Sequence, residues 1–173
     1  MSLSPQDSSL ELLDVVDATD RVVGRAPRGE VHRLGLRHRA AHILVFNAKA
    51  EVFVQRRAWW KECQPGRWDT SAAGHLDAGE DYAVAAVREL EEELGLRAEA
   101  GLRFLCRLEA GPETGNEFVN VYSFVTEQEP RPDPHEIIEG RWCAAEALEA
   151  WMAAEPQSFT AAFREIWNRY RQR

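Results

Sequence analysis

The stretch from Gly74 to Leu96, GHLDAGEDYAVAAVRELEEELGL, constrains the fold of this chain more than any other. Residues Tyr82 to Leu94 have the composition of a helix, because alanine, leucine and glutamate favour that conformation and neither proline nor glycine interrupts them. At about 100° per residue, four apolar side chains share one stripe, which we expect to dock on a sheet. They are Ala83, Val87, Leu90 and Leu94.

Three carboxylates crowd the side of this helix opposite the stripe. Glu89, Glu92 and Glu93 occupy positions i, i+3 and i+4, while Glu91 points elsewhere. Like charges at this spacing destabilise an isolated helix by roughly 0.2–0.5 kcal/mol per pair. A hard cation with oxygen ligands would reverse this penalty, and Mg²⁺ or Mn²⁺ suits such a cluster. A solvated acidic helix face is the alternative that composition alone favours.

The spacing around the helix changes the weight of these two interpretations. The stretch has the form G-x5-E-x7-R-E-L-x-E-E-x-G-L, with seven exact and two apolar positions. A chance match is on the order of one in ten million at average residue usage. The pattern satisfies every fixed position of the Nudix box, so the chain resembles the Nudix hydrolase family. The resemblance implies an α/β/α sandwich with a mixed sheet, a catalytic loop and helix, and C-terminal helices.

The resemblance also implies hydrolysis of a diphosphate linkage by metal-activated water. By motif position, Glu92 and Glu93 would be the main Mg²⁺ ligands, and Glu89 would complete the metal shell or take a proton from the attacking water. The Gly74 carbonyl is a further expected ligand. We expect Arg88 to orient a carboxylate by a bidentate pair.

Two further acidic residues have expected roles around the box. Glu80 is expected to be structural or to support the metal ligands. Many Nudix hydrolases add a carboxylate from a loop after the box, and Glu136, six residues before Trp142 in HEIIEGRW, matches one such arrangement. Glu117 is the competing candidate, and a surface loop acid is the alternative for Glu136.

The segments PRGEVHR, HRAAHILVFN, VQRRA, PGRWDTSAAGH and NEF resemble the isopentenyl-diphosphate isomerase branch of the superfamily, over roughly residues 10 to 145. In those isomerases histidines and glutamates hold a metal, and Mn²⁺, Zn²⁺ or Mg²⁺ suits that ligand set. The matching positions are His32, His38, His75 and Glu117. The second carboxylate of that site falls on Gly115. A structural cluster, or imidazoles that contact phosphate, is therefore the alternative.

The same resemblance suggests substrate contacts. Arg57 and Lys61 match a basic pair that contacts diphosphate, with ordinary solvated charge as the alternative. Trp60 and Phe118 are expected near the organic group of the substrate. The loop tryptophans would either stack on a nucleobase or pack over the core. They are Trp59, Trp60 and Trp68.

One position argues against isomerisation. The catalytic cysteine of the isomerases directly precedes the Gly-His pair, and here that position is Ala73. A methyl group neither donates nor removes a proton. The isomerases also depart from the full glutamate set that this chain keeps. We therefore expect a Mg²⁺-dependent hydrolase of a nucleoside diphosphate linked to another group, or of a related organic diphosphate. An isomerase-like enzyme and a non-catalytic ligand sensor are the alternatives.

The rest of the chain predicts strands and helices around this box. We expect a flexible N-terminus over residues 1–9 and a single domain over residues 10–173. Pro27 and Gly29 predict a loop that carries His32 and His38. Alternating or β-rich runs predict strands at residues 10–16, 21–25, 41–46, 52–57, 102–109, 117–126 and 137–143, with a short strand before the box. Two helices are expected over residues 144–154 and 159–171.

Composition restricts the classes of partner that the protein is expected to bind. The net charge is −8 with no basic run, which argues against a nucleic-acid polymer and favours a small-molecule diphosphate as partner. Cys63, Cys106 and Cys143 are scattered and show no metal-binding or disulfide pattern. No apolar run has membrane length, so we expect a cytoplasmic protein, either a monomer or a homodimer.

Overall fold

The computed structural model describes residues 8–173 and confirms the predicted mixed α/β fold. Its strands are β1 (Leu12–Val16), β2 (Val22–Pro27), β3 (His38–Phe46), β4 (Val52–Arg57), β5 (Trp68–Asp69), β6 (Ala72–His75), β7 (Arg103–Leu108), β8 (Glu117–Val125) and β9 (Ile137–Cys143). The helices are α2 (Arg28–Leu34), α3 (Tyr82–Leu94), α4 (Ala145–Ala154) and α5 (Ala161–Arg171). Two short 3-10 turns cover Pro112–Thr114 and Pro156–Ser158.

Strand β3 is the centre of a seven-stranded mixed sheet with the order β5-β4-β3-β8-β7. It runs parallel to β8 along its whole length and antiparallel to β4 and β6. The predicted hairpin between β3 and β4 forms, but the two strands pair only at Phe46 and Val52. Beyond that pair β6 takes the free edge of β3, and β9 pairs with β4. The sheet is therefore split between β3 and β4.

A buried serine closes this split. The Ser71 hydroxyl accepts a hydrogen bond from the Val45 amide at 2.7 Å and donates to the Phe53 carbonyl at 2.5 Å. Gln55 on β4 donates to the Ser71 carbonyl at 3.2 Å. Buried backbone groups need hydrogen-bond partners. These bonds therefore replace the missing backbone hydrogen bonds between β3 and β4, and they fix the segment that precedes β6.

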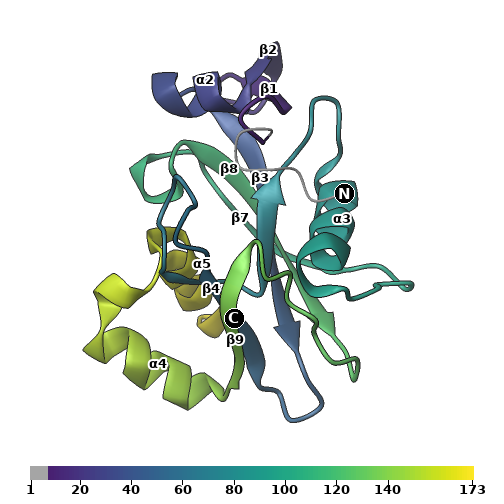
Figure 1. Cartoon of the computed structure of the whole chain (residues 1–173), viewed down its shortest axis with the longest axis vertical. Helices are drawn as coiled ribbons and strands as arrows, with labels where there is room; N and C mark the ends of the chain where they lie inside the picture. The colour runs from purple at the N-terminus through teal and green to yellow at the C-terminus, as the bar shows by residue number, and fades with distance from the viewer. Residues whose placement is uncertain (1–7) are drawn as a thin grey trace.

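Helices cover both faces of the sheet (Figure 1). Helix α3 packs on one face, over a core that includes Ile43, Leu90 and Leu94. Helices α4 and α5 pack on the other face, over a core that includes Leu44 and Phe163. The three layers are the α/β/α sandwich that the sequence predicts.

The segment between β2 and β3 corrects the sequence prediction, which expected a loop after Pro27. It forms helix α2 instead, with Val31 fully buried. Proline is tolerated at the start of a helix, where its missing N–H has no partner to lose. Gly35 ends the helix with a φ of 62°, a left-handed conformation that glycine adopts without strain. Burial of Val31 therefore outweighs the low helix propensity of Gly29.

The predicted first hairpin is present as a separate two-stranded sheet of β1 and β2. Asp20 in its turn accepts from Arg39 at 2.6 Å and pairs with Arg107 at 3.0 Å. The Tyr82 hydroxyl also donates to Asp20, at 3.0 Å. One carboxylate thus connects the hairpin with β3, β7 and α3.

The expected flexible N-terminus lies mostly outside the described residues, which begin at Ser8. Within them, the Ser9 carbonyl accepts from the Gly29 amide at 3.0 Å and the Ser8 carbonyl accepts from Glu11 at 3.2 Å. In residues 8–173, no helix combines the length and the apolar character needed to cross a membrane.

Candidate active site and histidine cluster

Helix α3 presents a different face to the sheet from the one that the sequence predicts. Ala83 is exposed and Val87 is only half-buried, so half of the expected apolar stripe is wrong. The buried side chains of the helix are Ala85, Ala86, Leu90, Glu93 and Leu94. The helix is rotated so that Glu89 and Glu93 turn inward. Glu93 meets polar partners on β4 and β6, whereas Glu89 lies against Gly74 and pairs with Arg88 of its own helix. Glu92 remains exposed.

Glu93 is the most deeply buried carboxylate of the box, with 4% of its surface exposed. It accepts a hydrogen bond from the Gln55 amide at 2.8 Å and another from the Ala73 backbone N–H at 3.3 Å. Burial raises the pKa of Glu93 to about 7, and the neighbouring Glu136 carboxylate adds to this effect while Lys61 opposes it. The hydrogen bonds therefore fix the side chain in position, while burial disfavours its ionised form.

Glu89 lies against Gly74, the first residue of the box. A Cβ atom on Gly74 would come within 2.0 Å of the Glu89 carboxylate, so any other residue there requires the Glu89 side chain or the strand to move. Burial and the charge of Glu93 raise the pKa of Glu89 to about 8, although Arg88 donates to it at 2.7 Å. The backbone of β6 and the carboxylate of α3 are thereby brought into contact at the position where the box predicts metal ligands.

Arg88 connects the box residues with one another. It donates to both oxygens of Glu80, at 2.9 and 2.8 Å, and to Glu92 at 3.3 Å. It also donates to the His75 carbonyl at 3.1 Å. Burial alone would raise the pKa of Glu80, but the hydrogen bond from Arg88 lowers it. Glu80 thus supports Arg88, which in turn supports the exposed and the buried carboxylates.

The second group of interest is a cluster that the structure assembles from four separate elements. It consists of His32 on α2, His38 on β3, His75 on β6 and Glu117 on β8, and one potential ligand atom from each lies within 4.8 Å of the others. His75 Nε2 lies 2.9 Å from Glu117 and 3.3 Å from His32 Nε2. His38 Nε2 lies 3.4 Å from the same Glu117 oxygen. The predicted set of four residues is therefore together in space.

The tautomer of His38 shows what this cluster can bind. Its Nδ1 lies 2.9 Å from the Leu36 carbonyl, which only accepts, so Nδ1 carries the proton. If the ring is neutral, Nε2 points a lone pair at the Glu117 carboxylate, and the two electron-rich groups suit a cation between them. If the ring is protonated, Nε2 faces Glu117 across 3.4 Å and the two groups form an ion pair.

The protonation of the cluster points in the same direction. Burial lowers the pKa of His75 to about 4, even though Glu117 favours its charged form. Burial alone would raise the pKa of Glu117, but the His38 and His75 imidazoles beside it hold this pKa well below its usual range. A neutral imidazole such as His75 beside an ionised carboxylate suits a metal ion. Gly115, the position of the second isomerase carboxylate, offers no side chain to it.

The two groups lie on opposite sides of one short strand. Side chains alternate along a strand, so His75 and Gly74 face opposite sides of β6. Gly74 faces Glu89 and α3, whereas the His75 ring faces the cluster. Arg88 spans the junction, because it binds the carbonyl of His75 and the carboxylate of Glu89.

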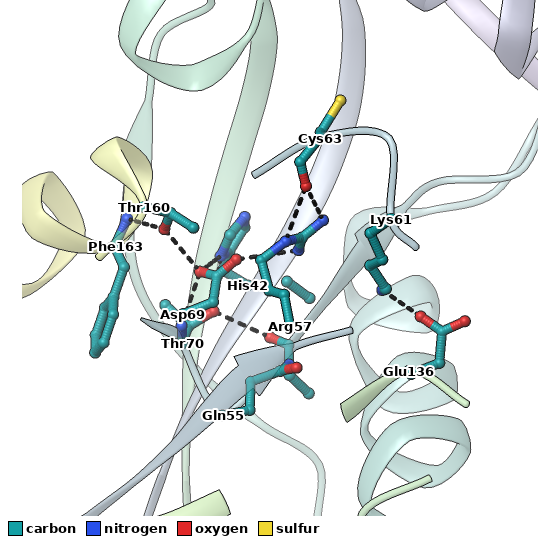
Figure 2. Close-up of polar contacts among 12 residues, drawn as sticks. His42, Gln55, Arg57, Lys61, Cys63, Asp69, Thr70, Glu136, Thr160 and Phe163 are labelled. Carbon is teal, nitrogen blue, oxygen red and sulfur yellow. Dashed lines mark hydrogen bonds and ion pairs between the residues drawn. The ribbon is translucent and has the colours of Figure 1, made fainter. Parts of the chain in front are cut away.

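The expected diphosphate-binding pair, Arg57 and Lys61, is engaged with protein groups. Arg57 pairs with the buried Asp69 at 3.2 Å and donates to the Cys63 carbonyl at 3.1 and 2.9 Å (Figure 2). Lys61 forms an ion pair with Glu136, as the same figure shows. Glu136 therefore lies next to the box rather than on a remote surface, since its charge acts on Glu93.

The aromatic candidates differ in their surroundings. Trp60 is 45% exposed, whereas Phe118 is buried with the Arg107 guanidinium 4.7 Å from its ring centre. Trp59 is exposed but lies across Gly66, beside Arg56. Trp68 is buried against Trp151 in the α4–α5 layer, which corresponds to the predicted alternative of core packing. Trp60 is therefore more accessible than Phe118 to the organic group of a substrate.

Sequence reasoning did not single out Gln55 and Asp69. Both are buried, and each orders a neighbour: Gln55 binds Glu93, and Asp69 accepts from Arg57, the Thr70 amide and the Thr160 hydroxyl. Figure 2 shows this network between β4, β5 and the start of α5. A polar residue directly after the apolar run VFV, within a predicted strand, is the signal that could have identified Gln55, because buried polar groups need partners.

The protein consists of a mixed sheet between helices, and its candidate site combines a glycine-containing strand with an acidic helix. A model of the NUDIX domain matches residues 36–163, and the chain belongs to the Nudix family. It is 44% identical over 144 residues to an uncharacterized Nudix hydrolase of Pseudomonas aeruginosa, covering 82% of this chain and 84% of the relative.

Two further proteins extend the comparison. An isopentenyl-diphosphate Δ-isomerase of Serratia proteamaculans is 32% identical over 159 residues, which cover 90% of this chain and 89% of the isomerase. The crystal structure of DR0079 from Deinococcus radiodurans superposes with a TM-score of 0.81 at 29% identity, over 92% of this chain and 98% of that one. The chain is thus similar both to Nudix hydrolases and to isomerases, as the sequence motifs indicate.

Proposed function

We propose that this protein hydrolyses the diphosphate linkage of a small organic diphosphate, such as a nucleoside diphosphate linked to another group, with Mg²⁺ or Mn²⁺. The main support is the contact between Gly74 and Glu89 beside the buried Glu93. Two carboxylates whose burial disfavours their charge would be stabilised as anions by a divalent cation. Their oxygens suit Mg²⁺ and Mn²⁺.

In this proposal Glu89, Glu92 and Glu93 hold the cation, with the Gly74 carbonyl and Glu136 as further ligands. The cation would neutralise the diphosphate and acidify a water molecule. Glu89 would either complete the metal shell or, once the cation has stabilised its ionised form, accept a proton from the attacking water. Arg88 holds the carboxylates in position through its bonds to Glu89 and Glu92.

The decisive experiment compares two substitutions on the same helix. Glu93→Gln should lower the rate of phosphate release from a panel of nucleoside diphosphate derivatives by about 100-fold or more, because a ligand of the reacting metal is lost. Glu91→Gln is the matched control, since Glu91 is exposed and pairs with Arg97. No turnover of any diphosphate by folded wild-type protein with Mg²⁺ or Mn²⁺ would contradict the proposal and favour a ligand sensor.

For the histidine cluster we propose a second divalent cation, with contact to substrate phosphate as the alternative. The support is the convergence of His32, His38, His75 and Glu117 and the tautomer of His38. Metal analysis of wild-type protein should find an ion such as Zn²⁺ or Mn²⁺ that His38→Ala loses. Equal metal content in the two proteins would leave the phosphate role or a structural role.

An isomerase-like activity is the second candidate, because the cluster is retained and relatives such as the Serratia protein bear that name. Ala73 occupies the position of the isomerase cysteine and has no proton to give. We expect no conversion of isopentenyl diphosphate by the wild-type protein. Detectable conversion would favour the isomerase. Conversion gained in Ala73→Cys would show that the rest of the site is compatible with isomerisation.

Three broader expectations accompany this proposal. We infer that residues 10–173 act as one domain, that the protein is cytoplasmic, and that its partner is a small-molecule diphosphate rather than a nucleic-acid polymer or a membrane. The acidic net charge of −8 supports the exclusion of a nucleic-acid polymer. Oligomeric state, monomer or homodimer, is left to measurement by light scattering.

A further inference from the structure

Lys61 occupies an unusual place for a lysine. Its side chain is only 12% exposed, and its ammonium forms an ion pair with Glu136, which is 29% exposed. Lysine carries a strongly hydrated charge and is seldom held away from water without a partner that offsets the cost. The partner here is a carboxylate that belongs to the metal site proposed above.

The chain builds a rigid support for this lysine. Residues 58–66 lie in the loop between β4 and β5. Arg57 clamps this loop, because its side chain pairs with buried Asp69 and donates twice to the Cys63 carbonyl. The Ala58 amide donates to the Glu136 carbonyl at 3.0 Å, and the Lys61 amide donates to the Ala58 carbonyl at 3.3 Å. Figure 2 shows how the clamp and the Lys61–Glu136 pair lie on either side of the same loop.

The charge of Lys61 reaches the box itself. Lys61 and its partner Glu136 both act electrostatically on the buried carboxylate of Glu93. The ammonium therefore lies in the field of two carboxylates, one from α3 and one from the segment before β9. A divalent cation bound by Glu93 and Glu136 would repel an ammonium in that place.

We propose that Lys61 is a tethered counter-cation, which neutralises Glu136 in the metal-free protein, competes with the divalent ion for this carboxylate, and turns to the substrate diphosphate once the ion displaces it. The inference rests on the proposed function, in which Glu93 and Glu136 are metal ligands. Lysine suits such an exchange because its long flexible stem moves a compact charge over several ångströms. The rigid clamp at Arg57 keeps the exchange local.

The test measures binding of Mn²⁺ alone, and then of inorganic pyrophosphate with Mn²⁺ present, by titration calorimetry. Lys61→Met removes the charge and keeps most of the apolar stem. It should tighten Mn²⁺ binding by about 3- to 10-fold and weaken pyrophosphate binding by a similar factor. A merely structural role for Lys61 would weaken both. The matched control is Lys49→Met, since Lys49 is exposed in the β3–β4 turn.

A double substitution separates this inference from loss of folding. In a Glu136→Gln background, Lys61→Met should no longer change Mn²⁺ affinity, because the competition has been removed. Unchanged or weaker Mn²⁺ binding in Lys61→Met, beside normal binding and turnover in wild type, would overturn the counter-cation role alone. Absence of both Mn²⁺ binding and diphosphate turnover in wild-type protein would overturn the proposed function and this inference together.

Discussion

At the scale of single residues, the acidic side chains of the box differ sharply although they lie within five positions of one helix. Glu93 and Glu89 are withdrawn from water, whereas Glu92 is exposed and pairs with Arg88. The difference arises from neighbours outside the helix, since Gln55 and the Ala73 amide receive Glu93 and Gly74 makes room for Glu89. The same residue type therefore has different chemistry at each position.

The raised pKa values predict how the metal-free protein responds to pH. Glu89 titrates near 8 and Glu93 near 7 in the folded state, against a usual value of 4.5. Above 4.5 the folded state retains protons that the unfolded chain has released, so stability falls as the pH rises, until both groups are ionised. We expect urea midpoints without metal to decrease from pH 6.5 to 8.5, and the contribution of the histidines to fade as the pH rises through this range.

Two comparisons check the origin of this slope. Glu89→Gln should flatten it, because the group with the higher pKa no longer ionises, and saturating Mg²⁺ should raise stability most at the alkaline end. A slope of equal size in Glu89→Gln would assign the effect to other groups.

His75 predicts the opposite sign at lower pH. Burial lowers its pKa from 6.5 to about 4, so the folded state resists a proton that the unfolded chain accepts. The contribution of His75 to stability should therefore be lost as the pH falls from about 6.5 towards 4, in opposition to the contribution of Glu89 and Glu93. In thermal unfolding, the stability of His75→Gln relative to wild type should increase as the pH falls over that window, and a constant difference would contradict the assignment.

At the scale of elements, β6 and α3 form the unit on which both candidate sites depend. Four residues of β6 contribute a glycine to one side and a histidine to the other, and Arg88 of α3 binds the backbone between them. Such close contact between strand and helix is possible because no side chain stands between Gly74 and Glu89.

Gly74→Ala tests this contact. The added methyl would lie about 2 Å from the Glu89 carboxylate and would force the buried acid or the strand to move. We expect a loss of stability of about 1–3 kcal/mol in urea unfolding, together with weaker Mn²⁺ binding. Gly24→Ala is the control, because a Cβ on Gly24 meets nothing within 4 Å. Equal stabilities of the two variants would mean that Glu89 adjusts at little cost.

At the scale of the whole molecule, the N-terminal hairpin and α2 are fastened to the sheet and bring His32 to the other three members of the cluster. Asp20 is the main polar connection, since it binds Arg39, Arg107 and Tyr82 from three different elements. Its side chain is 10% exposed, so these bonds form largely away from water. Burial, with the nearby Asp20 charge, also raises the pKa of Tyr82 and keeps it a donor.

Asp20→Asn should separate the hairpin from the sheet. Asparagine keeps the shape and the left-handed backbone, but it removes the carboxylate that pairs with Arg39 and leaves Arg107 with Glu109 alone. We expect a loss of about 2 kcal/mol in the free energy of unfolding and a lower metal content of the histidine cluster. Glu113→Gln, an exposed acid, is the control. Unchanged stability and metal content would show that β1, β2 and α2 are held by apolar packing alone.

Local patterns predicted β4, β9 and α3 with their exact bounds, and most other elements to within a few residues, because strand and helix periodicity are properties of neighbouring residues. They failed at α2, where burial of Val31 outweighed the turn signals of Pro27 and Gly29. They also failed for the inward face of α3, since the partners of Glu89 and Glu93 lie on other segments.

By itself the sequence determined the family, the order of most elements and the residue types of both candidate sites. The reason is that the spacing of the box and the alternation of apolar and polar residues in strands are properties of neighbouring positions. Only the tertiary structure decided which carboxylates are buried, that the histidines of three segments meet Glu117, and that Lys61 pairs with Glu136. The physical reason is that burial and charge pairing depend on groups far apart in the chain. Their distances exist only once the sheet has been assembled.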